Sequence, residues 1–213
     1  MATLLKRLAW PVRVLIVIAA LVPLATFSYP LWHYDFEAPQ YPEGLAMSIW
    51  SYRLGGRVDL INGLNHYVGF MALHAEDFIE FKILPVAIVL VIITGLAVAV
   101  IGTFKALASW LVGYGLFGAL AFADFYRWLY TFGTTVDPRA AISIEGYTPP
   151  MLGTSQFMNF YITSYPGVAA YLLVGSMLLG ILAFVLARRG RLRTPTAQEA
   201  AARRASRRTT AAV

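Results

Sequence analysis

Four long apolar segments divide the chain, at residues 12–32, 81–102, 107–132 and 166–187. Each has about 20 residues or more, the length that an α-helix needs to cross a hydrocarbon core about 30 Å thick. The pattern therefore predicts an all-α membrane protein with four transmembrane helices in residues 1–187. Two long loops, 33–80 and 133–165, are expected to form a cap, and residues 188–213 a basic, disordered tail.

The first loop is too long for a plain connection and carries signals of its own. Residues 45–54 and 57–61, joined by a Gly-Gly turn, predict a small β-hairpin. Residues 62–69 are rich in turn formers, and residues 73–81 predict a short helix that leads into the second apolar segment. The second loop is interrupted by prolines and glycines, which indicates irregular structure packed against a surface.

Charge is distributed unequally between the two sides of these segments. The N-terminus, the short link between the second and third segments, and the tail carry 12 of the 17 Lys and Arg residues and one of the 11 acidic residues. The positive-inside rule then predicts a bacterial inner-membrane protein with both termini cytoplasmic and both long loops periplasmic. The basic tail is expected to contact anionic lipid headgroups of the bilayer and not nucleic acid.

The chain contains no cysteine. This excludes covalently attached c-type haem, thiolate-bound iron–sulfur clusters, thiolate copper centres and disulfide bonds. We also find no nucleotide-binding glycine pattern and no pairing of a nucleophile with a base, so we do not expect an enzyme.

The densest group of polar residues lies between Asn62 and Glu80. It contains His66, Met71 and His74, and imidazole together with thioether favours copper, above all Cu(I). A helix through Met71 and His74 would place both on one face, with His66 closing from a turn. The alternative is that His66 bonds to backbone groups of the loop and that His74 is solvated or lies near a helix N-cap. Met71 would then fill space in the core.

A second polar group lies near the end of the third apolar segment. Asp124 and Arg127 are three residues apart on a predicted helix, and an unpaired charge at that depth is costly, so we expect an ion pair. The alternative is a docking place for a quinone head, a partner helix or a metal relay, which Asp137 would extend. Small residues at Gly115, Ala119 and Ala123 predict close packing of another helix.

Several stretches of both loops form a recognisable set: residues 37–45, 61–69, 136–142, 149–153 and 156–160. Together they resemble a family of bacterial multi-helix membrane proteins that is associated with the maturation of copper enzymes, especially with nitrous oxide reductase gene sets. The chain departs from that family's pattern just before Asp137, where Thr134 or Thr135 stands in place of a His. The resemblance implies roles for the following residues: Asn62, Asn65, His66, Tyr67, Gly69, Asp137, Pro138, Pro149, Pro150, Gly153 and Asn159.

Two functions remain open from the sequence. The first is a membrane accessory protein that binds or passes copper at the periplasmic face through His66, Met71 and His74. The second is a non-catalytic structural or docking subunit of a larger membrane redox or photosynthetic complex. In both, the partners are the lipid bilayer and other membrane or periplasmic subunits, with Asn62, Asn65, Tyr67, Asp124, Arg127 and Asp137 in structural or docking roles.

Overall fold

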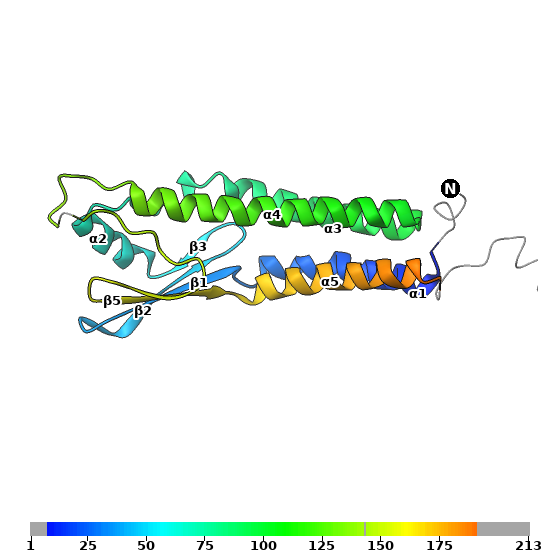
Figure 1. The fold of residues 1–213 in the computed structure, drawn as a ribbon, viewed down its shortest axis with the longest axis horizontal. Coiled ribbons are helices and arrows are strands. Elements are labelled where there is room, and N and C mark those ends of the chain that lie inside the picture. Colours follow the sequence, from blue (N-terminus) through cyan, green and yellow to red (C-terminus); the bar gives the residue numbers. More distant parts are fainter. Residues whose placement is uncertain (1–7, 143, 191–213) are drawn as a thin grey trace, which may run out of the picture. The chain divides into compact units, whose positions relative to one another are not determined.

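The computed structural model describes residues 8–142 and 144–190 (Figure 1). The predicted tail lies outside the described residues from residue 191 onward. The helices are α1 (Trp10–Leu21), α2 (Val58–Val68), α3 (Glu80–Ile101), α4 (Phe104–Thr134) and α5 (Val168–Arg188), with two 3-10 helices, η2 (Val22–Phe27) and η3 (Ala75–Asp77). The strands are β1 (Trp32–Ala38), β2 (Tyr41–Ile49), β3 (Leu54–Gly56), β4 (Gly153–Phe157) and β5 (Phe160–Pro166).

Four helical segments are long and apolar enough to cross a membrane: Trp10–Phe27, Glu80–Ile101, Phe104–Thr134 and Val168–Arg188. Many of their large apolar side chains are exposed, as Val100 and Leu120 are, which is expected where the solvent is lipid. The chain is thus a multi-pass membrane protein, as predicted. The first span ends earlier than predicted, because Pro23 lacks an N–H and the helix continues only as the 3-10 helix η2.

The all-α prediction is wrong in one respect, because the structure also contains a five-stranded antiparallel sheet. Its strand order is β3-β2-β1-β5-β4, so the central strand β1 pairs with β2 from the first loop and with β5 from the second. Tyr34 lies opposite Met47 on one side and opposite Ser164 on the other. The two predicted loops are therefore joined in one sheet.

The predicted hairpin is only partly right. Strand β2 pairs with β3, but β3 is Leu54–Gly56, and residues 58–61 belong to helix α2 instead of a returning strand. Residues 62–68 belong to the same helix, so the turn predicted there, with His66 in it, is wrong. Val58, Ile61 and Leu64 recur at helical spacing, and Gly69 ends the helix in the left-handed conformation. A short apolar run with this spacing forms a helix when its apolar side packs against a core.

The described residues divide into two compact units. The helix unit comprises residues 8–21, 91–114 and 175–190, and the sheet unit comprises residues 22–90 and 115–174 except residue 143. Helices α3, α4 and α5 contribute to both units.

The helix unit is held by close approach of helices and by bonds to backbone carbonyls. Ser176 Oγ donates to the carbonyl oxygen of Ala19 at 2.6 Å, and Trp110 Nε1 donates to that of Val91 at 3.0 Å. Arg13 Nε donates to the carbonyl oxygen of Ala99 at 2.7 Å, near the end of α3, where a cation favours the helix dipole. A Cβ on Gly95 would lie 2.7 Å from the Ala20 side chain, so glycine permits this packing.

The small residues expected to pack against another helix lie elsewhere on α4. Gly115, Ala119 and Ala123 belong to the sheet unit, and all three are exposed.

The sheet unit has its own apolar core. Its buried members are Tyr34, Met47, Ile61, Leu129 and Ile162, which come from β1, β2, α2, α4 and β5. Alternate residues of a strand point to opposite faces, so β1 and β5 each present one apolar face to α2 and α4.

Candidate functional site

A partly open cavity of about 420 Å³ lies against the core of the sheet unit. Apolar side chains of the sheet, of α2 and of α4 form most of its wall. Among them are Phe36, Met47, Leu64, Phe125 and Leu129. This volume falls within the range of small-molecule sites, about 300–1,000 Å³, which are also mostly apolar with a few placed polar groups.

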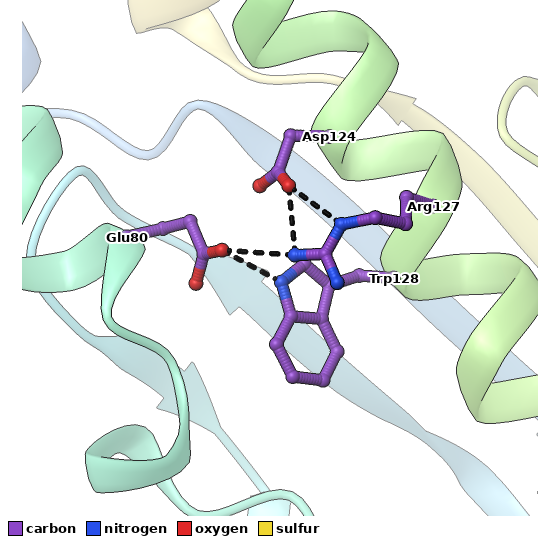
Figure 2. Close-up of polar contacts among 4 residues, drawn as sticks. All are labelled: Glu80, Asp124, Arg127 and Trp128. Carbon is purple, nitrogen blue, oxygen red and sulfur yellow. Dashed lines mark hydrogen bonds and ion pairs between the residues drawn. The ribbon is translucent and has the colours of Figure 1, made fainter.

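Polar groups of the wall gather where α3 begins and α4 passes (Figure 2). Glu80 Oε1 accepts from Trp128 Nε1 at 2.9 Å and from Arg127 Nη2 at 3.2 Å. Arg127 Nε also donates to Asp124 Oδ1 at 2.8 Å. We call these four residues, Glu80, Asp124, Arg127 and Trp128, the Glu80 cluster.

The Glu80 cluster contains the ion pair that the spacing of Asp124 and Arg127 predicts. Arg127 is about half exposed, so the pair by itself adds little to stability. Glu80 and Trp128 have no predicted site role, because Glu80 is 47 residues before Arg127 and an acid at a helix start is ordinarily explained by the helix dipole.

The second oxygen of Glu80 differs from the first. Glu80 Oε2 is buried and has no hydrogen-bond partner among the described residues. Figure 2 shows that both dashed lines from this carboxylate start at its other oxygen. A buried acceptor without a partner costs about 1–3 kcal/mol.

Two asparagines of helix α2 form hydrogen bonds with the segment that follows the helix. Asn62 Nδ2 donates to the carbonyl oxygen of Leu73 at 3.0 Å, and the Leu73 N–H donates to Asn62 Oδ1 at 2.7 Å. Asn65 Nδ2 donates to the carbonyl oxygen of Met71 at 3.3 Å. The two side chains therefore act as backbone partners for residues 71–73, which form part of the cavity wall.

The two sequence motifs around Gly69 and Asp137 contact each other directly. The Asp137 N–H donates to the carbonyl oxygen of Gly69 at 2.8 Å, and the Ile142 N–H donates to that of Tyr67 at 3.0 Å. The Arg139 guanidinium and backbone N–H bind Asp137 and hold the pKa of its carboxyl below its usual range, with a smaller effect from His66. Tyr67 itself is exposed.

The three predicted copper ligands lie in different surroundings. His66 is exposed in the last turn of α2, Met71 is half-buried in the cavity wall, and His74 is exposed just before η3. The predicted helix over residues 73–81 is only partly right, because Ala75–Asp77 forms a 3-10 helix and residues 80–81 belong to α3, whereas the other residues are not helical. The helical face expected to carry Met71 and His74 therefore does not form.

A metal site made of His and carboxylates is not evident. Across residues 8–142 and 144–190, no group of three or more His, Asp and Glu side chains could hold a metal ion. Copper ligation through the thioether of Met71 remains a prediction.

Tyr34 is a buried core residue of the sheet unit. Its hydroxyl donates to the carbonyl oxygen of Pro150 at 2.9 Å, so β1 is tied to the proline-rich part of the second loop. Burial raises the pKa of Tyr34 to about 12. Burial also raises the pKa of Tyr147, whose hydroxyl is bonded to Ser155 in β4.

No protein-family model matches the chain, and no curated protein is significantly similar to it in sequence. The fold and the cavity define its class: a multi-pass membrane protein that carries a five-stranded antiparallel sheet and an apolar cavity beside that sheet.

Proposed function

We propose that this protein is a non-catalytic membrane protein that holds an apolar or amphiphilic small molecule in the cavity of its sheet unit. One observation carries this proposal: a cavity of about 420 Å³ lies within a unit whose core is otherwise packed, and its wall is largely aliphatic and aromatic. Atoms that line an apolar pocket have no packing partners on one side when no ligand is bound. A bound apolar ligand supplies these partners.

The charge distribution supports an orientation for the proposed site. The basic N-terminus, link and tail favour the cytoplasmic side. The sheet unit, with 10 of the chain's 11 acidic residues, would then face the periplasm of a bacterial inner membrane. A ligand could reach the cavity from the outer leaflet or from a periplasmic partner.

Ala121 offers a direct test. It lies in the cavity wall on α4, and a larger side chain there would occupy the cavity. The experiment compares the wild type with Ala121→Phe, each extracted with its surrounding lipid in a polymer-bounded disc. Native mass spectrometry then measures small molecules that stay bound after the disc is exchanged for detergent.

Ala123→Phe is the matched control, because Ala123 is exposed on the same helix and does not line the cavity. We expect the wild type and Ala123→Phe to retain an amphiphile and Ala121→Phe to lose it. Equal retention by Ala121→Phe, or no retained molecule in any of the three proteins, would contradict the proposed function.

Copper handling and a subunit role in a larger membrane complex remain predictions from the sequence. Of the three predicted copper ligands, only Met71 lines the cavity, so copper binding and occupation of the cavity involve largely different residues. The two ideas can therefore be tested by separate variants.

A further inference from the structure

We infer that the ligand of the cavity is an amphiphile with one long, unbranched alkyl chain that lies lengthwise along α4. The chain ends near Leu84 and Ala121. Its polar head lies at the outer rim, by which we mean the wall residues Gln40, Tyr67 and Asn159. The inference rests on the proposed function, because it names the ligand class of the same cavity. The proposed function requires only an apolar occupant, whereas the inference gives that occupant a shape and an orientation.

The cavity wall follows one face of α4 over about three turns. The residues of α4 that line it recur at helical spacing: Ala121, Asp124, Phe125, Trp128, Leu129 and Phe132. From Ala121 to Phe132 the helix rises by about 16 Å, because each residue adds about 1.5 Å. The cavity is therefore long in the direction of α4.

Strand β1 runs along the cavity in the same direction as α4. Its first residue, Trp32, packs against Phe125, with ring centroids 5.2 Å apart. Tyr34, further along the strand, belongs to the same buried core as Leu129, further along the helix. Tyr34 and Phe36 lie on one face of β1, and both line the cavity. A strand and a helix thus border the same elongated space.

Leu84 and Ala121 form the inner end of the wall. Each lies about one turn further into its helix than the Glu80 cluster, Leu84 in α3 and Ala121 in α4. Both belong to segments that are long and apolar enough to cross a membrane, where the surrounding solvent is lipid. Neither side chain has a hydrogen-bonding group, so this end suits the terminal methyl group of a chain.

The outer rim is polar and exposed. Asn159 Nδ2 donates to Gln40 Oε1 at 2.8 Å, so the tips of the β1–β2 and β4–β5 hairpins meet there. Phe70 and Phe132, with ring centroids 5.0 Å apart, hold the end of α2 beside the outer end of α4. A polar head loses hydrogen bonds to water inside an apolar wall, but it keeps them at an exposed rim of amide and phenol groups.

The length of the wall sets the length of the chain. An extended chain advances about 1.2 Å per bond, since a fully extended residue of three backbone bonds spans about 3.3–3.6 Å. A wall of about 16 Å therefore matches about 13 bonds, or a chain of about 14 carbons. A compact molecule with as many carbons would leave part of this wall without packing partners.

Two alcohols with the same number of carbons separate a chain from a compact body: 1-pentadecanol and 9-anthracenemethanol. Each is added at the same mole fraction of lipid to the full chain in lipid nanodiscs. Native mass spectrometry then measures the alcohol that is retained after exchange into digitonin, a detergent with a rigid body in place of a single chain. We expect the wild type to retain at least about tenfold more 1-pentadecanol, because the ring system packs against only part of the wall.

Val68→Phe tests the assigned length. Val68 lines the cavity in the last turn of α2, at the outer end. In a series of primary alcohols, retention by the wild type should rise up to about 14 carbons and then level off. In Val68→Phe it should level off about two carbons earlier, because the ring occupies the outer end. His66→Phe is the control, since His66 is exposed in the same turn and does not line the cavity.

Two modified chains test the orientation. Pentadecyl maltoside has a bulky head, which should lie outside the exposed rim, so the wild type should retain it as well as 1-pentadecanol. A pentadecanol with a phenyl group at its far end should be retained less, because that end lies between Leu84 and Ala121. The opposite order of these two compounds would overturn the orientation.

The outcomes separate the two proposals. Equal retention of 9-anthracenemethanol and 1-pentadecanol by the wild type, lost in Ala121→Phe, would overturn the inference and leave the proposed function standing. An unchanged dependence on chain length in Val68→Phe would also overturn it, provided that this variant still retains 1-decanol. Retention of neither alcohol by the wild type would contradict the proposed function itself. The comparison of the two alcohols uses the wild type alone, so it decides even where Val68→Phe does not fold.

Discussion

The backbone N–H of Asp137 donates to the carbonyl oxygen of Gly69 at 2.8 Å. This bond joins the end of α2 to the segment after α4, two parts of the chain separated by the whole of α3 and α4. Phe70 and Val136 form a β-bridge beside it. One side of the cavity therefore depends on the backbone conformation at Gly69.

Gly69→Ala is expected to destabilise the protein. Gly69 has a positive φ of 79°, and an added Cβ would lie 2.8 Å from the carbonyl oxygen of Asp137 and from the Ala140 side chain. We expect a loss of about 1–3 kcal/mol in the free energy of unfolding, measured by thermal unfolding in detergent. Gly63→Ala is the control, because its Cβ would meet nothing within 4 Å on the same helix, and it should be neutral or slightly stabilising.

Asn62→Ala is expected to release residues 71–73. The substitution removes two hydrogen bonds and leaves the N–H and carbonyl oxygen of Leu73 without their partner, at a cost of about 1–3 kcal/mol. Hydrogen exchange of the Leu73 amide would rise first. Asn159→Ala removes an exposed side-chain bond to Gln40 and should change stability by less than about 0.5 kcal/mol. Equal effects of the two substitutions would contradict the role given to Asn62.

The buried Tyr34 hydroxyl is expected to make the folded protein less stable in strong alkali. Burial raises its pKa from 10.0 to about 12 in the folded protein, so the neutral hydroxyl is favoured by folding. Its contribution is complete below pH 10 and is lost as the pH rises through about 12. The free energy of unfolding should therefore fall across this interval.

Tyr34→Phe identifies the group responsible for that alkaline loss. The variant lacks the bond to Pro150 and should be less stable than the wild type at pH 8, but its stability should fall less between pH 10 and 12. Tyr165→Phe, which alters a hydroxyl bonded to Asp35 at the exposed face, should remove a smaller part of the alkaline loss. The reverse order of these two variants would contradict the assignment.

Copper retention tests the ligands predicted from the sequence. If His66 and His74 are copper ligands, the double variant His66→Ala/His74→Ala should lose the metal that the wild type keeps after mild extraction, as measured by elemental analysis. His33→Ala is the control, because His33 stacks on Tyr165 and lies on β1, outside the predicted ligand set. An unchanged copper content in the double variant would reject His66 and His74 as ligands.

The candidate site was only partly predictable. The pairing of Asp124 with Arg127 follows from their spacing on one helix, and the motifs around Asn62 and Asp137 were singled out before their contact was known. Glu80 and Trp128 were not predicted, because their hydrogen bond links residues 48 positions apart and no local sequence pattern indicates such a contact. Met71 and His74 do not share a helical face, and the Asn62 and Asn65 side chains bind the non-helical backbone of Leu73 and Met71.

The sequence by itself determined the four membrane-spanning helices. Their hydrogen bonds are local, and a run of about 20 apolar residues has few other stable forms in lipid. Only the tertiary structure decided the sheet and the cavity, because β1 completes its hydrogen bonds with strands from both loops, one of them more than 100 residues away. The proline- and glycine-rich character of the second loop concealed β4 and β5, which become strands only where a neighbouring strand supplies their partners.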